Sequence, residues 1–260
     1  MQIEHIGVVK CQQRFRYEAP RQGSIAPANE ALIVLKDDKS FTEALNGLSE
    51  FEYIWVIYEF HLNQTWHPLV RPPSDDVGKL GVFATRSPHR PNRIGMSCVR
   101  LAEITKITLR IEKHDLLDGT PVLDIKPYIP YADSFPNASA GWVDRREEIE
   151  YKLSIDCLAA RQMEWVKENA GWDLKNFLLI QLRTEPDNGV RKRIKHIKEN
   201  SYVISYRTWR IEYQIDFEDC LVNILCVSTG YESSAFNFVS DDVFNDKEIH
   251  KLFVKKYPFN

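Results

Sequence analysis

No two of the five cysteines in this chain of 260 residues stand at Cys-x-x-Cys spacing, so no cysteine pair is present to complete a zinc-finger pattern with histidines. Structural zinc sites require such pairs, so their absence excludes that class of site and, with the odd cysteine count, favours a reducing compartment. No apolar run approaches the roughly 18 residues of a membrane span, and the first residues do not combine a basic segment with an apolar one. We therefore expect a soluble, cytoplasmic protein that binds neither a metal nor a membrane.

Positive charge is not in excess either, because 34 Lys and Arg residues stand against 37 Asp and Glu residues, for a formal net charge of -3. Affinity for a polyanion comes largely from Lys and Arg that neutralise phosphates, so the overall charge does not point to RNA. Only local basic patches could contact a nucleic acid. An apolar content of 43% with 27% charged residues is ordinary for a folded globular protein.

Glycine-rich nucleotide-binding units are also missing. The chain has no succession of strand, Gly-x-Gly-x-x-Gly and helix, and no regular alternation of strands with helices, which excludes a Rossmann fold. The first half is instead dominated by short runs of Val, Ile and aromatic residues, which are typical of strands. These runs are 3–10, 31–35, 51–60, 81–85, 96–104, 107–113 and 122–128. Such closely spaced strands predict a mainly β N-terminal barrel, with one short helix that a capping box at Ser40–Glu43 opens.

The character of the sequence changes from about Ala138 onward. Ser154 is placed to cap one helix and Asp173 to cap another. Two long strands follow, at 202–215 and 221–228. We therefore expect three parts: a β-barrel domain at 1–140, a smaller α+β domain at 150–232 and an unassigned tail at 233–260.

Residues 81–97 contain the densest group of polar side chains. Proline and glycine make this segment a rigid loop between two strands, and it presents Arg86, Arg90 and Arg93 where a ligand can meet both side chains and backbone. The alternative is a solvated turn whose arginines form surface ion pairs. Three further polar segments adjoin predicted strands, at 20–23, 60–63 and 115–128. Singly, they have ordinary explanations: a loop, a hydrogen-bonded structural His61 and an Asp-Gly turn.

In combination, these segments resemble the bacterial and archaeal TsaA-like, or VirR-like, family, whose characterised members are tRNA (adenine-N6)-methyltransferases of the TrmO type. The matching features are Ile6–Val9 with Pro20–Gln22, the Trp55 strand leading into His61, Val70–Pro73, the Arg-Ser-Pro loop and Leu117–Pro127. The resemblance implies a barrel that binds S-adenosylmethionine without a Rossmann motif, near a homodimer interface. It also implies methylation of N6 in N6-threonylcarbamoyladenosine at position 37 of tRNA.

The resemblance further implies which residues contact the cofactor. They are Pro20, Arg21, Gln22, His61, Leu62, Arg86, Leu116, Leu117, Asp118, Gly119, Thr120 and Pro121. Position 62 departs from the family, because a polar residue such as Gln is expected where this chain has Leu. His89 lies at a position where relatives tolerate unrelated residues, so we expect it at the rim of the site and not as a catalytic base.

Methyl transfer from a sulfonium is an in-line displacement that needs alignment of the acceptor nitrogen, the methyl group and the sulfur, and no covalent nucleophile. The lone pair of an adenine amine is delocalised, so a carboxylate that takes its proton would assist the reaction. Asp118 is the candidate by position. The alternative for Asp118 is an ordinary turn residue before Gly119.

Contact with a tRNA anticodon loop is expected to use stacking aromatic residues and basic side chains. Arg90 and Arg93 lie beside the predicted cofactor site. A second basic group comes later in the chain and consists of Arg191, Lys192, Arg193 and Lys195. The alternative for this second group is the solvated face of a helix.

One departure from the family concerns the second domain. Relatives carry an Asp-Pro-Arg-Pro-like motif where this chain has Thr184–Asn188. Two rival functions therefore stay open: a non-catalytic RNA-binding or regulatory β-barrel protein, and a methyltransferase of small molecules.

Overall fold

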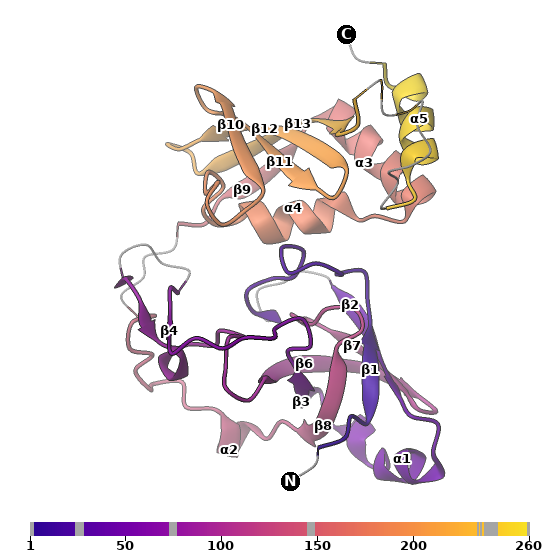
Figure 1. Ribbon diagram of the computed structural model, residues 1–260, viewed down its shortest axis with the longest axis vertical. Helices are drawn as coiled ribbons and strands as arrows, with labels where there is room; N and C mark the ends of the chain where they lie inside the picture. Colours follow the sequence, from indigo (N-terminus) through magenta and orange to yellow (C-terminus); the bar gives the residue numbers. More distant parts are fainter. Residues whose placement is uncertain are drawn as a thin grey trace. The chain divides into compact units, whose positions relative to one another are not determined.

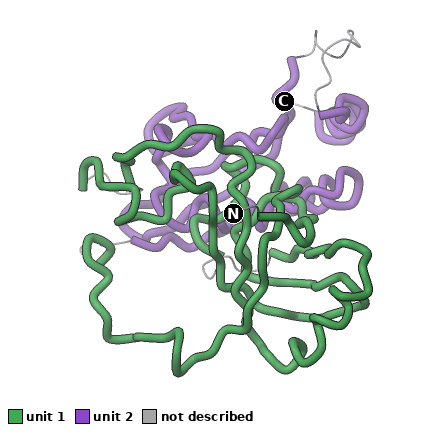
Figure 2. The backbone as a smooth tube through the Cα atoms, turned by 60° about the horizontal axis from the view of Figure 1, so that its bottom comes forward, with its two compact units in different colours: residues 1–147 green, residues 148–260 purple. Residues whose placement is uncertain are grey.

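The computed structural model describes residues 3–23, 29–72, 77–144, 149–232, 234, 236 and 244–258. The chain forms two compact units, Met1–Glu147 and Glu148–Asn260, which Figure 2 colours separately. Each unit has its own sheet and its own buried core. Within the described residues, no helix is long and apolar enough to cross a lipid bilayer.

The first unit is built on a closed six-stranded barrel (Figure 1). Its strands are β1 (Gly7–Lys10), β2 (Glu30–Leu35), β3 (Tyr53–Glu59), β6 (Ile94–Thr105), β7 (Thr108–Glu112) and β8 (Pro121–Pro127). They follow the order β1-β2-β7-β6-β3-β8, and every neighbouring pair is antiparallel, including the β8 to β1 pair that closes the ring. Closure leaves no unpaired edge in this sheet. The prediction of a mainly β barrel without a Rossmann fold is confirmed.

Alternation of side chains along the strands explains why these runs close into a barrel. In β3, Ile54, Val56 and Tyr58 are buried, whereas Trp55 and Ile57 between them are only half-buried. All six strands contribute apolar side chains of this buried kind to one core. The intervening positions of β3 therefore face outward and form a surface outside the barrel.

Two local predictions in the first unit are wrong. Residues 81–85 do not form a barrel strand, because β5 (Leu80–Gly81) pairs with β4 (Leu69–Val70) and a 3-10 helix, η4 (Val82–Ala84), follows it. Ser40 does not cap α1 (Lys39–Ala44). Asp38 does so instead, by accepting a hydrogen bond from the Ser40 N–H at 2.7 Å. Further short helices are η2 (Leu48–Glu50) and α2 (Pro130–Asp133).

The second unit is an α+β domain with a five-stranded sheet in the order β10-β11-β12-β13-β9 (Figure 1). Its elements are β9 (Lys152–Ile155), α3 (Cys157–Ala170), α4 (Leu174–Leu182), β10 (Ile194–Lys198), β11 (Ser201–Tyr206), β12 (Trp209–Asp216), β13 (Leu221–Thr229) and α5 (Lys247–Lys256). β9 pairs with β13 in parallel, and the other neighbours are antiparallel. Asp173 caps α4 as predicted, because its carboxylate accepts a hydrogen bond from the Asn176 N–H.

Other predictions for the second unit need correction. Ser154 lies within β9, and Asp156 takes the N-cap position of α3. The predicted strand at 202–215 is two strands, because the chain turns sharply at Arg207, whose φ of 52° is left-handed. The basic run is not the face of a helix, since its residues 194–198 form β10.

The tail that the sequence left unassigned contains a structured helix. α5 presents Phe253, which is fully buried and packs against Trp209 with ring centroids 5.0 Å apart. His250, one turn earlier, stacks on the same indole at 3.7 Å. Helix α5 is therefore part of the core of the second unit.

Candidate active site

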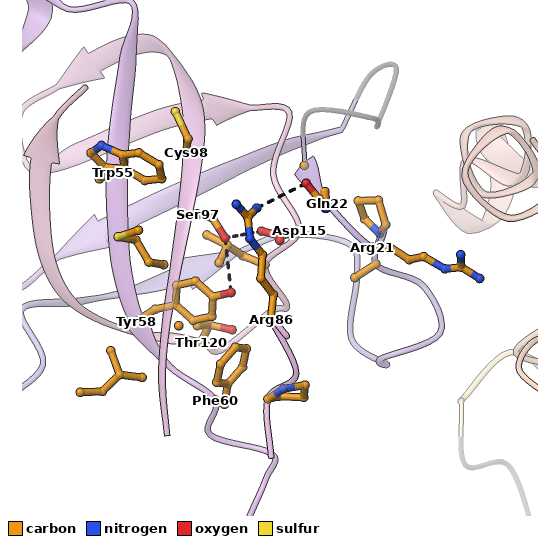
Figure 3. Close-up of a pocket in the computed structure, with 18 of the residues that line it drawn as sticks. Arg21, Gln22, Trp55, Tyr58, Phe60, Arg86, Ser97, Cys98, Asp115 and Thr120 are labelled. Atoms are coloured by element: carbon orange, nitrogen blue, oxygen red, sulfur yellow. Dashed lines mark hydrogen bonds between the residues drawn. The ribbon is translucent and has the colours of Figure 1, made fainter. Parts of the chain in front are cut away.

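A cavity of about 980 Å³ opens in the first unit, at the end of the barrel where β1 and β3 finish and β6 and β8 begin. Antiparallel pairing brings these four strand ends together. The segments 20–23, 60–63, 85–90 and 115–120, which are far apart in the sequence, each contribute to the lining of this one cavity. Figure 3 shows several of the side chains that line it.

Most of the residues predicted to bind the cofactor line this cavity. Those that do are Pro20, Arg21, Gln22, His61, Leu62, Arg86, Leu116, Leu117 and Thr120. Asp118, Gly119 and Pro121 are not among the lining residues. Leu62, where relatives are expected to carry a polar residue, faces the cavity and is 45% exposed. An apolar side chain there can contribute surface to a ligand but no side-chain hydrogen bond.

Asp118 instead fastens the turn to the neighbouring strand region. Its Oδ1 accepts a hydrogen bond from the Cys11 N–H at 3.1 Å, and its own N–H donates to the Gln13 carbonyl at 2.7 Å. Gly119 follows with a φ of 77°, the left-handed conformation expected of an Asp-Gly turn. This placement matches the turn-residue alternative, and a role for Asp118 as proton acceptor stays a prediction.

A different carboxylate, Asp115, lies in the cavity. Its Oδ1 accepts a hydrogen bond of 2.5 Å from the Ser97 hydroxyl, which is also 3.3 Å from the Tyr58 hydroxyl (Figure 3). Burial raises the pKa of Asp115, and the hydrogen bond from Ser97 and the charge of Arg86 oppose that rise. No functional role was predicted for Asp115 from the sequence. Its one signal is that Asp115 stands between His114 and two leucines, in a context that favours burial.

Arg86 and His61 both line the cavity but differ in charge. The guanidinium of Arg86 donates to the side-chain oxygen of Gln22 at 3.4 Å, which links the loop after β5 to the loop after β1. Burial lowers the pKa of His61, so its imidazole is neutral at neutral pH. The cavity therefore combines the positive charges of Arg86 and of the other lining arginines, Arg16, Arg21 and Arg90, with the neutral imidazole of His61.

The other two arginines of the loop support its shape. Arg90 donates to the backbone carbonyls of Val82 and Thr85, at 3.3 and 2.9 Å. Arg93 forms an ion pair with Glu59 at 2.9 Å and donates to the carbonyl of Asn63. Arg90 lines the cavity, whereas Arg93 is not among its lining residues. Their predicted contact with RNA stays a prediction beside these structural contacts.

Aromatic side chains form one outer wall of the cavity. Trp55 and Tyr53 on the outward face of β3 lie near Tyr128, with ring centroids 5.7 and 6.3 Å from it. The indole N–H of Trp55 donates to Asp133 at 3.0 Å, which fixes the orientation of the ring. Flat, half-buried rings of this kind can stack on a base or on another aromatic ligand.

In the second unit, the four basic residues of the predicted RNA-binding group differ in their surroundings. The ammonium of Lys192 donates to the carbonyl of Gln181 in the last turn of α4 and to those of Thr184 and Glu185 just beyond it. It therefore satisfies carbonyls that the helix end leaves unpaired. Arg191 is half-buried, whereas Arg193 and Lys195 are exposed.

Comparison with known proteins finds tRNA methyltransferases among the similar proteins. The tRNA-methyltransferase O N-terminal domain matches residues 8–134. A protein of Escherichia coli K12 named tRNA (adenine(37)-N6)-methyltransferase is 37% identical over 169 residues, which cover 62% of this chain and 72% of that protein. A protein of Pyrococcus abyssi named "Probable S-adenosyl-L-methionine-binding protein" is 41% identical over 54% of this chain and 74% of its own length.

A solved structure extends the likeness beyond the barrel. The crystal structure of TrmO from Pseudomonas aeruginosa superposes with a TM-score of 0.65 at 29% identity, and covers 88% of this chain and 98% of that protein. The matched part thus includes much of the second unit as well as the barrel. The chain therefore belongs to the TrmO family of tRNA methyltransferases.

Proposed function

We propose that this protein transfers the methyl group of S-adenosylmethionine to N6 of N6-threonylcarbamoyladenosine at position 37 of tRNA. The observation that carries the proposal is the convergence, in one cavity, of four segments far apart in the sequence. Membership of the family supports the reaction class, and the relative named for adenine 37 supports the position of the target. The threonylcarbamoyl group on the target is the further step of the proposal.

The cavity suits a ligand with both charged and aromatic parts, as S-adenosylmethionine has. Arg86 and Gln22 supply polar groups, while Leu62 and Leu116 supply apolar surface. A volume of about 980 Å³ lies at the upper end of the range of roughly 300 to 1,000 Å³ for small-molecule sites. We assign the space beyond the cofactor to the target nucleoside, with the aromatic wall of Trp55 and Tyr128 beside it.

The tRNA needs contacts beyond the target nucleoside, because most of its affinity comes from phosphates. Arg193 and Lys195 on the second unit are exposed basic side chains at the edge strand β10 and its preceding turn. We assign them to backbone contacts with tRNA. A local basic group of this kind accounts for RNA binding by a chain whose net charge is -3.

We also propose that the protein is a homodimer. Ile94, Met96 and Phe135 on the rim of the cavity are 40%, 58% and 73% exposed, an unusual group of large apolar side chains at a surface. A second copy of the chain would cover them. Light scattering after gel filtration measures the mass directly, and a monomer at micromolar concentration would contradict the assignment.

Mass spectrometry of nucleosides tests the reaction. Bulk tRNA is compared between cells with and without the protein. Loss of N6-methyl-N6-threonylcarbamoyladenosine in cells without the protein is the expected result. An unchanged nucleoside profile would contradict the proposal. Titration with S-adenosylmethionine then separates the two rivals, because a small-molecule methyltransferase binds the cofactor and a purely RNA-binding protein does not.

A further inference from the structure

Asp115 has the surroundings of a functional carboxylate. Ser97 is the one side chain among the described residues that donates a hydrogen bond to it, at 2.5 Å. Ser97 and Tyr58 are buried to 8% and 7% exposure, and all three residues line the cavity. The backbone N–H of Asp115 is a second donor to the carboxylate, and no described residue forms an ion pair with it. The carboxylate is therefore fixed in orientation by Ser97 and open toward the cavity.

The proposed reaction needs a group that removes a proton. In N6-threonylcarbamoyladenosine, N6 carries one hydrogen and is bonded both to the purine and to a carbonyl carbon. Its lone pair is delocalised in both directions, so the neutral nitrogen is a poor nucleophile. Removal of the N6 proton restores a localised pair, and a buried carboxylate within hydrogen-bond reach can accept that proton.

Resting on the proposed function, we infer that Asp115 is the proton acceptor in methyl transfer and that Ser97 is the residue that positions it. The N6–H bond breaks and its proton passes to the Asp115 carboxylate. The N6 electron pair forms a bond to the methyl carbon while the bond from that carbon to sulfur breaks. The sulfur keeps the electron pair, S-adenosylhomocysteine leaves, and Asp115 later releases its proton to water.

The groups that face Asp115 set its strength as a base. Burial raises its pKa, which makes the ionised carboxylate a stronger proton acceptor. Ser97 and the nearby positive charge of Arg86 limit the rise and keep the carboxylate available in its ionised form. Tyr58 stays a neutral phenol, because burial and then the charge of Asp115 raise its pKa. His114, the preceding residue, has a pKa of about 4 and is neutral under the same conditions.

Single-turnover kinetics with the full-length enzyme in excess tests the inference. The substrates are S-adenosylmethionine with a labelled methyl group and tRNA that carries N6-threonylcarbamoyladenosine. Asp115→Asn should slow transfer at least about 100-fold, as expected for loss of a general base. Binding of S-adenosylmethionine, measured by titration, should be preserved. The matched control is Asp124→Asn, on a half-buried aspartate paired with Lys126 at 2.9 Å outside the cavity, and it should keep the wild-type rate.

The pH profile separates a base from a structural residue. In the wild type the rate should rise with pH to a plateau as Asp115 ionises, and in Asp115→Asn this rise should disappear. Ser97→Ala should move the rise to higher pH, because it removes a hydrogen bond that lowers the pKa of Asp115. This second variant tests the inference even if Asp115→Asn does not fold.

Three results would overturn the inference: wild-type rates in Asp115→Asn, a Ser97→Ala profile identical to that of the wild type, or loss of the pH-dependent rise in Asp118→Asn or His114→Asn instead. Each of them requires that the wild-type enzyme methylates the modified tRNA. Absence of any transfer by the wild type would contradict the proposed function itself, so the two failures are distinguishable.

Discussion

His114 gives a stability prediction whose sign and size follow from its surroundings. It is fully buried, and its Nδ1 accepts a hydrogen bond from the Leu116 N–H at 3.2 Å. Its backbone exchanges hydrogen bonds with the side chain of Asn29, which fastens this segment to the start of β2. Burial lowers the pKa of His114 from 6.5 to about 4, because the imidazolium would lose its hydration.

The sign of the effect follows from which state binds the proton. Between pH 6.5 and about pH 4 the unfolded chain protonates His114 while the folded protein does not, so the free energy of unfolding falls as pH falls. At roughly 1.4 kcal/mol per unit of pKa difference, the full loss is about 3 kcal/mol. With a urea dependence of about 2 kcal/mol per molar, the unfolding midpoint should fall by roughly 1.5 M from this group alone.

Urea unfolding of the wild type and of His114→Asn between about pH 7 and pH 4 measures this loss. Asparagine does not titrate, and its side-chain oxygen can accept the Leu116 N–H in place of Nδ1. The constant cost of the smaller side chain cancels when the two pH dependences are compared. Asp115 titrates in both proteins, with the opposite sign, and also cancels. Parallel pH dependences in the two proteins would refute the reasoning.

The remaining predictions concern the cofactor cavity and the basic residues of the second unit. Arg86→Ala should weaken S-adenosylmethionine binding about tenfold or more, because a charge-assisted contact contributes roughly 1.5 to 3 kcal/mol, and calorimetric titration measures it. An unchanged affinity would remove Arg86 from the site. Lys192→Met should lower the free energy of unfolding by about 2 kcal/mol in denaturant titration, because three carbonyls lose a charged donor. The double variant Arg193→Ser and Lys195→Ser should instead leave stability unchanged and flatten the salt dependence of tRNA binding. Equal salt slopes for this double variant and the wild type would exclude these residues from the tRNA surface.

The barrel could be predicted from the sequence because closely spaced runs of Val, Ile and aromatic residues mark its strands. The prediction of a strand at 81–85 was wrong for a local reason. Val, Phe and Thr favour a strand, but the Thr85 N–H donates to the Val82 carbonyl and closes a 3-10 turn. The prediction of one continuous strand at 202–215 was wrong because the turn at Arg207 contains neither glycine nor proline to mark it. An arginine with a positive φ cannot be recognised from the amino-acid composition of the segment.

The site shows a different limit of sequence reasoning. The resemblance to the family identified the segments that carry the cofactor-binding residues, and the structure shows that most of these residues line one cavity. The sequence pointed to Asp118 as the candidate base and not to Asp115, which stands three residues earlier in the same loop. That choice depends on which neighbour each carboxylate meets, the Ser97 hydroxyl of β6 or the Cys11 N–H beyond β1. Such partners are distant in sequence and become visible only when the strands are paired.

The register between β3 and β6 connects the fold to the proposed chemistry. Tyr58 pairs with Gly95 and Val56 pairs with Ser97, so the hydroxyls of Tyr58 and Ser97 lie diagonally across neighbouring strands. A Cβ at position 95 would come within 2.5 Å of the Tyr58 ring, so glycine is what lets that ring lie flat over β6 and reach Ser97. The barrel thereby fixes Tyr58 and Ser97 by backbone pairing, and Ser97 in turn fixes Asp115. A loop alone would not hold a carboxylate in one orientation, so we attribute to this requirement the contact between Asp115, in the loop between β7 and β8, and Ser97 of β6.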